Sequence, residues 1–229
     1  MILELATFLQ LAQACAPTVS PTTLAAVVQT ESKFNTLAIN INGEGARYPR
    51  SPEEAVEIAS SAIADGKSVD LGIGQINSRN LDWLDLTVAD AFDPCKNLSA
   101  AAKVLEDGYT QSVDESGQPG QEALQMAFSA YNTGNTTKGF RNGYVARVLS
   151  AATEVVPAIE LERATQADGS VTLHGVQLPP GAPRVASEVV ATDPTSREGD
   201  AVKTEEKSSW DPFNRERQSA GVVLFRDKN

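Results

Sequence analysis

Glu31 occupies a position in the sequence where a charge is costly. With three apolar residues it follows the i, i+3, i+4, i+7 spacing of one helix face: Leu24, Val27, Val28 and Glu31. Pro21 favours a helix start just before them, since proline suits the first helical position. A carboxyl group held against apolar side chains loses solvation of its charged form, and its pKa rises. We therefore predict that Glu31 keeps a proton near neutral pH and acts as a general acid.

A second segment with chemical potential covers residues 70–77. Gly72 and Gly74 flank one apolar residue and are followed by two amides, Gln75 and Asn77. The segment is not a dinucleotide-binding fingerprint, because the third glycine is missing. The glycines allow a close backbone approach, and the amides offer donors and acceptors suited to sugar hydroxyl and acetamido groups. The alternative is a turn that carries polar side chains.

Two tyrosines complete the set of candidate groups. Tyr131 and Asn132 end an apolar helical pattern just before Gly134, and Tyr144 opens the next one. Both tyrosines are equally explained as core residues whose hydroxyls reach the surface.

Composition excludes most other chemistries. The chain of 229 residues has one histidine, His174, in a stretch rich in proline and glycine. A Ser-His-Asp triad, a Cys-His peptidase and a multi-histidine zinc site are therefore improbable, and we expect no cofactor and no metal. The formal net charge of −11 repels nucleic acid and anionic membranes.

The apolar stretches are far shorter than the roughly 20 residues that a membrane-spanning helix needs, so we expect no integral membrane segment. Residues 1–12 are apolar, yet they lack a basic region and contain Glu4. We interpret them as the first amphipathic helix of the fold rather than as an export signal. The two cysteines, Cys15 and Cys95, fit either one disulfide or two separately buried thiols, and their spacing does not decide between these.

Helical periodicity runs from the start of the chain to about residue 156, so we predict a mainly α domain over 1–156. Ser51 and Pro52 open one helix with a capping box. A helix near Leu98 is predicted to stop around Gly108, and another spans about 121–131. The last begins near Tyr144.

After residue 156 the pattern changes. Residues 157–207 are rich in proline and poor in large apolar residues, and we predict a flexible linker. Residues 208–229 restore aromatic and apolar content, including Trp210 and Phe213. This short tail motif is either a docking segment for a partner or a solvated end with incidental apolar residues.

Taken in order, four motifs resemble the soluble lytic transglycosylase family, which has a lysozyme-like fold. They are Glu31-Ser32, Gly72-Ile73-Gly74-Gln75, Ala130-Tyr131-Asn132 and Tyr144-Val145. A narrower resemblance links residues 15–19, 92–98 and 209–213 to the VirB1 proteins of type IV secretion systems. The resemblance implies a goose-type or soluble-transglycosylase-like catalytic domain followed by a largely disordered C-terminal tail. It also favours a Cys15–Cys95 disulfide.

The resemblance implies an activity as well. Family members cleave the β-1,4 bond between N-acetylmuramic acid and N-acetylglucosamine in peptidoglycan and leave 1,6-anhydromuramyl ends. Glu31 would be the acid and then the base. The substrate-binding residues carried over are Ser32, Gly74, Gln75, Asn77, Tyr131, Asn132 and Tyr144, and Tyr144 would also contact Glu31. Asp70 is the obvious second carboxylate, but we interpret it as an exposed loop residue and leave it out of the catalytic set.

By the same resemblance the protein acts in the periplasm, where VirB1 proteins open local gaps in peptidoglycan. Its partners would be glycan strands and, through the tail, secretion system subunits. Two alternatives stay open. The first is a goose-type-lysozyme-like hydrolase that uses water. The second is a peptidoglycan-binding assembly adaptor in which catalysis is secondary or lost.

Overall fold

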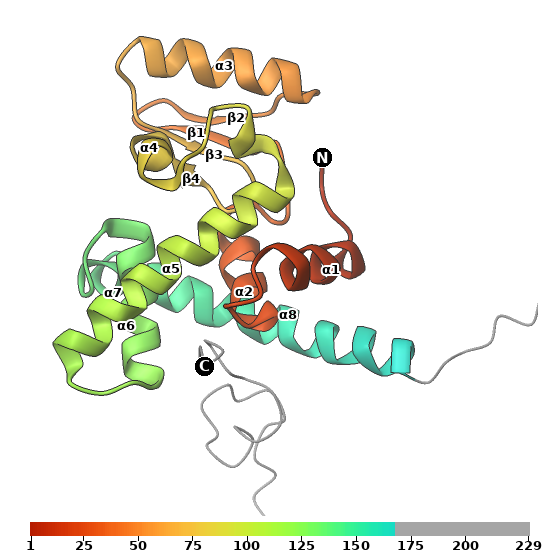
Figure 1. Cartoon of the computed structure of the whole chain (residues 1–229), viewed down its shortest axis with the longest axis vertical. Helices are drawn as coiled ribbons and strands as arrows, with labels where there is room; N and C mark the ends of the chain where they lie inside the picture. Colours follow the sequence, from red (N-terminus) through yellow and green to blue (C-terminus); the bar gives the residue numbers. More distant parts are fainter. Residues whose placement is uncertain (168–229) are drawn as a thin grey trace, which may run out of the picture.

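The computed structural model describes residues 1–167 (Figure 1). The helices and strands in chain order are α1 (Leu5–Cys15), α2 (Pro21–Glu31), β1 (Ile39–Ile41), β2 (Gly45–Arg47), α3 (Pro52–Ala64), β3 (Val69–Leu71), β4 (Ile76–Asn77), α4 (Leu81–Leu84), α5 (Pro94–Ser116), α6 (Gln121–Thr133), α7 (Lys138–Arg141) and α8 (Tyr144–Ala167). The tail motif at 208–229, most of the predicted linker and the predicted disorder lie outside the described residues.

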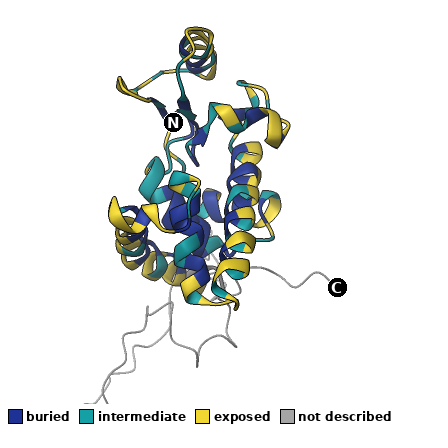
Figure 2. Ribbon diagram, turned by 90° about the vertical axis from the view of Figure 1, so that its left-hand side faces the viewer, coloured by how far each residue is buried: buried dark blue, intermediate teal, exposed yellow. Residues whose placement is uncertain are grey.

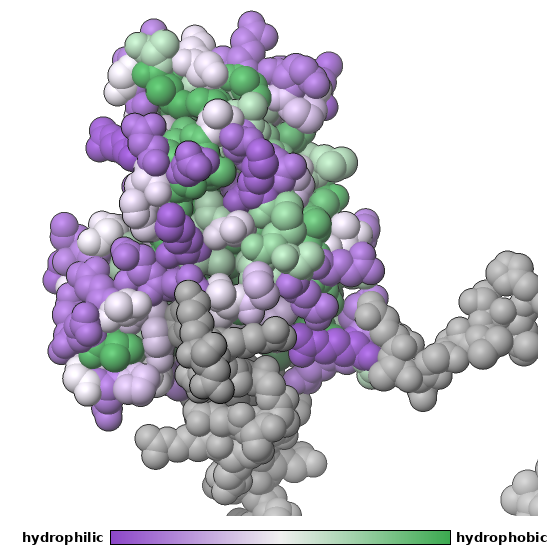
Figure 3. All heavy atoms as spheres, viewed as in Figure 1, coloured by the Kyte–Doolittle hydropathy of each residue, from purple (hydrophilic) through white to green (hydrophobic). Residues whose placement is uncertain are grey.

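The small sheet separates α3 from the other long helices (Figure 1). Below it, α1, α2, α6 and α8 pack together, and α5 runs from the sheet into this helical part. Buried residues gather along the inner faces of these helices, while the outer faces are exposed (Figure 2). On the face seen in Figure 3, hydrophobic residues reach the surface mainly beside the sheet and α1.

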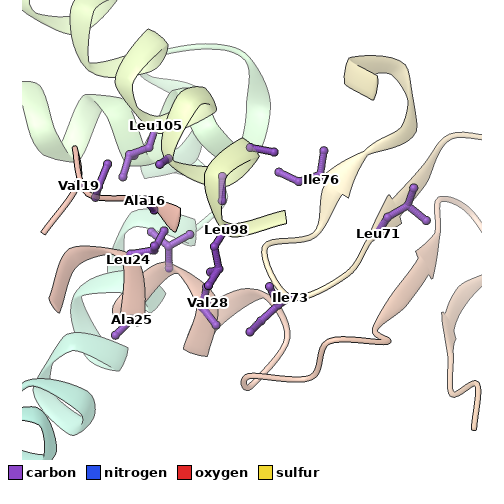
Figure 4. Packing of buried hydrophobic residues seen from close by; sticks show 14 of the residues in the cluster. Ala16, Val19, Leu24, Ala25, Val28, Leu71, Ile73, Ile76, Leu98 and Leu105 are labelled. Carbon is purple, nitrogen blue, oxygen red and sulfur yellow. The ribbon is translucent and has the colours of Figure 1, made fainter. Parts of the chain in front are cut away.

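Helix α2 confirms the prediction made from its periodicity. Leu24, Val27 and Val28 are completely buried, and the helix packs against α8. Figure 4 shows Val28 of α2 and Leu98 of α5 close to Ile73, which lies between the two strands β3 and β4. The core therefore extends from the helices to the loop that contains the glycine motif.

The four-stranded sheet has the order β2-β1-β3-β4, and all its pairs are antiparallel. The sequence analysis predicted no strands, because each one is two or three residues long and cannot show a period-2 pattern. One cross-strand row matters for the site: Ala46 pairs with Asn40, Asn40 with Asp70, and Asp70 with Asn77.

Helix α3 begins where the capping box predicted. The Ser51 hydroxyl accepts from the Glu54 backbone N–H at 3.2 Å. In a capping box the Glu54 carboxylate would accept in return from the backbone N–H of Ser51. Here it accepts from the backbone N–H of the preceding residue, Arg50, at 2.7 Å.

Helix α5 corrects the expected stop at Gly108. The helix continues to Ser116 and ends at Gly117, whose φ of 75° is left-handed. Gly108 lies instead where α6 crosses closely, because a Cβ at this position would meet the Ala130 Cβ at 3.1 Å. This glycine permits helix packing rather than ending a helix.

Helix α8 corrects the expected boundary at residue 156. It passes through Pro157 and continues to Ala167. Ile159 is completely buried in the core, so the turn after the proline belongs to the domain. Proline removes one backbone donor from a helix, but the packing of this apolar side chain favours continuation.

Candidate active site

A groove of about 970 Å³ runs between the end of α2, the sheet and the end of α6. Its walls include the carboxylates of Glu31 and Asp70 and the side chains of Gln75, Asn77 and Tyr131. The structure therefore brings together residues from three of the four motifs that the sequence analysis singled out.

Glu31 is the last residue of α2 and is enclosed on most sides. Burial raises the pKa of its carboxyl group to about 7, and the nearby Asp70 charge adds to the increase. Two groups act in the opposite direction: a hydrogen bond from Tyr144 and the charge of Arg147 lower the pKa. The balance leaves a carboxyl group that exchanges a proton near neutral pH, as the sequence predicted.

Tyr144 lies behind Glu31. Its hydroxyl donates to Glu31 Oε1 at 2.5 Å, and the residue is 2 % exposed. Burial raises the pKa of the Tyr144 phenol well above its ordinary value, so it remains a donor at neutral pH. Its contact with Glu31 is the one that the family resemblance implied. Tyr144 is not among the residues that line the groove, and its role in binding substrate stays a prediction.

Two hydrogen bonds attach the glycine loop to the helices. Ser32 directly follows Glu31 in the chain, and its hydroxyl donates to the Ile73 carbonyl at 2.6 Å. The Tyr131 hydroxyl donates to the Gly74 carbonyl, also at 2.6 Å. Ser32 and Tyr131 thus hold the loop at a fixed place beside the acid.

Close packing explains why positions 72 and 74 are both glycine. A Cβ at Gly72 would lie 2.2 Å from the Ala91 carbonyl oxygen, and one at Gly74 would lie 2.9 Å from the Ala101 Cβ. Gly74 is buried and is not among the residues that line the groove, and its role in binding substrate stays a prediction. Its role in the structure is to let the loop lie against α5.

Asn97 was missed by the sequence analysis. This residue of α5 is completely buried, and its Oδ1 accepts from the Gly74 N–H at 2.8 Å. Its Nδ2 donates to the carbonyls of Leu71 and Ala91 at 2.9 and 2.7 Å. Asn97 therefore satisfies three buried backbone groups around the glycine loop. The one feature of the sequence that pointed to Asn97 was its place in residues 92–98, one of the segments that resemble the VirB1 proteins.

The Gln75 amide is used mainly within the protein. Its Nε2 donates to the carbonyls of Gly72 and Ala38 at 2.9 and 3.1 Å, which occupies both amide hydrogens. The residue has a left-handed backbone, with φ at 53°. Gln75 lines the groove, and its Oε1 is the atom left to meet a ligand.

Asp70 corrects the expectation of an exposed loop residue. It lies in β3, is partly buried and lines the groove. Its oxygens accept from Asn77 Nδ2 at 2.7 Å and from Asn40 Nδ2 at 3.1 Å, across the neighbouring strands. Asn77 also donates to Ser68 at 2.8 Å, so both of its amide hydrogens are used to hold the sheet face.

Asn132 is exposed at the groove, where its Oδ1 accepts from Asn142 Nδ2 at 2.9 Å. Its amide hydrogens face no partner within the described chain and remain available to a ligand. Of the predicted binding residues, Asn132 is thus the one whose donors the fold does not use.

Cys15 and Cys95 form a disulfide with their Cα atoms 5.3 Å apart. The bond joins the last residue of α1 to the first turn of α5. Within residues 1–167 no cluster of three or more His, Cys, Asp or Glu side chains could hold a metal ion. None of the helices described is both long enough and apolar enough to cross a membrane.

Comparison with known proteins places these features in context. Residues 8–150 match the transglycosylase SLT domain family. The chain is 39 % identical over 238 aligned residues to the type IV secretion system protein virB1 of Brucella suis, covering 95 % of this chain and 99 % of the relative. It is 41 % identical over 160 residues to protein virB1 of Agrobacterium fabrum, covering 69 % and 64 %. No solved structure matches the chain significantly.

Proposed function

The chain belongs to the transglycosylase SLT domain family, and on that premise we propose that it is a lytic transglycosylase that cleaves the β-1,4 bond between N-acetylmuramic acid and N-acetylglucosamine. The observation that supports this proposal most is the environment of Glu31, a carboxyl group with a pKa near 7 at the wall of an open groove. Such a group can give and take one proton in a single cycle.

In the first step, protonated Glu31 donates to the glycosidic oxygen as the bond to the anomeric carbon breaks. Tyr144 determines which oxygen holds the proton. Because its phenol stays protonated and donates to Oε1, the acidic proton resides on Oε2. The leaving N-acetylglucosamine unit takes this proton, and positive charge develops at the muramyl anomeric carbon. The acetamido group of the substrate stabilises that charge.

In the second step, Glu31 is a carboxylate and accepts the proton of the muramyl C6 hydroxyl. The C6 oxygen then bonds to the anomeric carbon and closes a 1,6-anhydro ring. No water is consumed, and the proton taken from the C6 hydroxyl restores the acid form of Glu31. The hydrogen bond from Tyr144 favours the first step rather than this one, because it stabilises the carboxylate that remains once Glu31 has given up its proton.

One observation favours a second candidate, a hydrolase with the same fold. Asp70 lines the same groove as Glu31, and its charge raises the pKa of Glu31, so the site holds two carboxyl groups. Glycoside hydrolases commonly use such a pair. In a hydrolase, water would attack the anomeric carbon and the product would carry a reducing end.

Mass spectrometry of the muropeptides released from purified sacculi separates the two candidates. A transglycosylase releases 1,6-anhydromuramyl products, which are lighter by one water molecule than the reducing products of a hydrolase. We expect anhydro products from the full chain. A predominance of reducing ends would replace the proposed function by the hydrolase.

We also propose that the protein acts in the periplasm and locally opens peptidoglycan for a type IV secretion system. The similarity to the virB1 relatives supports this proposal, since it extends over 95 % of the chain. The adaptor alternative is tested by removing residues 168–229, which leaves α8 complete. If that truncation abolishes secretion while Glu31→Gln does not, the protein acts mainly as an adaptor.

A further inference from the structure

Tyr48 is exposed inside the groove without a function in the account above. Large apolar side chains are exposed at six places in the described chain, and the Tyr48 side chain is the most exposed of them, at 82 %. These residues are Met1, Ile2, Tyr48, Trp83, Phe140 and Leu161. Tyr48 alone among them lines the groove. An aromatic ring left in water at a binding groove is a candidate contact surface for a ligand.

The sheet register locates Tyr48 on the groove face. Ala46 pairs with Asn40, and side chains two residues apart on a strand point to the same face. Tyr48 follows the end of β2 and therefore continues the face that carries Asn40 and Asp70. The sheet order places β2 at one edge and β4 at the other. Asn77 and Tyr48 are thus at opposite ends of a floor three strand spacings wide, about 4.8 Å each.

Arg47, the neighbour of Tyr48, holds the hairpin between β1 and β2 in its conformation. Arg47 Nη1 donates to the carbonyls of Gly45 and Ala46, both at 3.2 Å, and Nη2 binds the Glu44 carboxylate at 2.7 Å. Lys67 binds the same carboxylate at 2.5 Å. The hairpin that carries Tyr48 is therefore held in shape before any ligand arrives, which lowers the entropy lost on binding.

The surroundings of the ring fit a saccharide. The Tyr48 side chain has no hydrogen bond, ion pair or ring contact within residues 1–167, and Ala46, two residues earlier on the same face, is small. The amide of Asn40 and the carboxylate of Asp70 lie further along the same floor. Aromatic faces are electron-rich and attract the C–H face of a pyranose ring, while amides and carboxylates bind its hydroxyl groups.

We propose that Tyr48 is a stacking platform for one saccharide unit of the glycan strand, at a subsite on the β2 edge and away from the bond that Glu31 cleaves. The assignment rests on the proposed function for the identity of the glycan. It adds that the groove grips a strand over several units, so that long strands bind more tightly than short ones. The ring of Tyr48, and not its hydroxyl, carries the contact.

The test measures binding without turnover. Isothermal titration calorimetry is performed on the full chain carrying Glu31→Gln, with a hexamer of β-1,4-linked N-acetylglucosamine and with peptide-free glycan strands as ligands. Adding Tyr48→Ala should weaken binding of both ligands roughly three- to tenfold, the range expected for one aromatic contact. Tyr48→Phe should retain the affinity, because the ring is kept.

Phe140→Ala is the matched control, since Phe140 is an exposed aromatic residue of α7 that does not line the groove. It should leave binding unchanged. In the enzyme with Glu31 intact, Tyr48→Ala should raise KM for glycan strands, with the loss falling on KM rather than on kcat. Thermal unfolding verifies that each variant is folded.

Equal affinity of the Tyr48→Ala variant and its parent for the hexamer and the glycan strands would overturn the assignment. Failure of this assignment and failure of the proposed function give different results. If the parent releases anhydro products while Tyr48→Ala changes neither affinity nor KM, the Tyr48 inference alone fails. If Tyr48→Ala weakens glycan binding but the wild-type chain releases no anhydro product, the lyase proposal fails and the subsite stands.

Discussion

The hydroxyl of Tyr144 donates to Oε1 of Glu31 at 2.5 Å, joining residues that are 113 positions apart. The contact brings the first residue of α8 to the last residue of α2, two helices that pack along each other. The packing of these helices therefore affects the pKa of Glu31 in two ways. Burial raises this pKa, and the hydrogen bond from Tyr144 lowers it.

Tyr144→Phe should raise the pKa of Glu31 above about 7, because the bond that stabilises the carboxylate is lost. The alkaline limb of the pH–activity profile should move to higher pH. Turnover should fall by roughly ten- to a hundredfold, since hydrogen bonds to charged groups contribute about 1.5–3 kcal/mol. Solubilisation of sacculi from pH 5 to 9 measures both effects. Tyr109→Phe, outside the groove, is the control, and a Tyr144→Phe profile that coincides with wild type contradicts the prediction.

The wild-type pH dependence follows from the sign of the Glu31 shift. Its pKa rises from 4.5 to about 7, so the acid form required for the first step is present below pH 7 and is lost as the pH rises through that value. Activity should therefore decline on the alkaline side with an apparent pKa near 7. A decline centred near 4.5 would mean that Glu31 is not the group that titrates.

Asp70→Asn should move the alkaline limb of the pH–activity profile to lower pH, the opposite direction from Tyr144→Phe. Removing the Asp70 charge takes away a repulsion that raises the pKa of Glu31, so the apparent pKa should fall. Asp114→Asn, an exposed carboxylate on α5, should leave the profile unchanged. Identical profiles for Asp70→Asn and wild type would show that the two carboxyl groups do not interact.

Asn97→Ala should destabilise the domain by about 3 kcal/mol or more, because three buried backbone groups lose their partner. Urea unfolding followed by circular dichroism measures the loss. Asn132→Ala is the matched control and should change stability by about 0.5 kcal/mol or less, since Asn132 is exposed. Equal effects of the two substitutions would contradict the structural role given to Asn97.

Reducing the Cys15–Cys95 disulfide should lower the free energy of unfolding by about 4.5 kcal/mol in the chain-entropy model, since the bond spans 80 residues. Urea unfolding with and without a thiol reductant tests this. The Cys15→Ser/Cys95→Ser variant should have the lower stability and no response to reductant. A wild-type transition that reductant leaves unmoved would contradict the prediction.

The sequence predicted those features that depend on neighbouring residues. The apolar face of α2 and the high pKa of Glu31 follow from spacing along one helix, and the close approach at Gly74 follows from the lack of a side chain. Positions that depend on distant segments were missed. Asn97 is identifiable only once α5 lies against the glycine loop, 23 residues away in the chain.

The errors have the same cause. Gly108 and Pro157 were interpreted as helix ends, because local propensity favours that result. In the structure, α6 packs directly on Gly108, and the buried Ile159 holds the turn after Pro157 in the core. Asp70 was placed in a loop because strands of two or three residues have no recognisable period. Tertiary packing decided each of these positions.

The substitution Glu31→Gln tests the central claim most directly. The amide is nearly the same size as the carboxyl group but cannot donate the proton. Release of 1,6-anhydromuramyl products from purified sacculi, followed by mass spectrometry, should fall to background for Glu31→Gln and stay at the wild-type level for Glu122→Gln, an exposed residue of α6. Undiminished release of anhydro products by the folded Glu31→Gln variant would contradict the assignment of Glu31 as the acid.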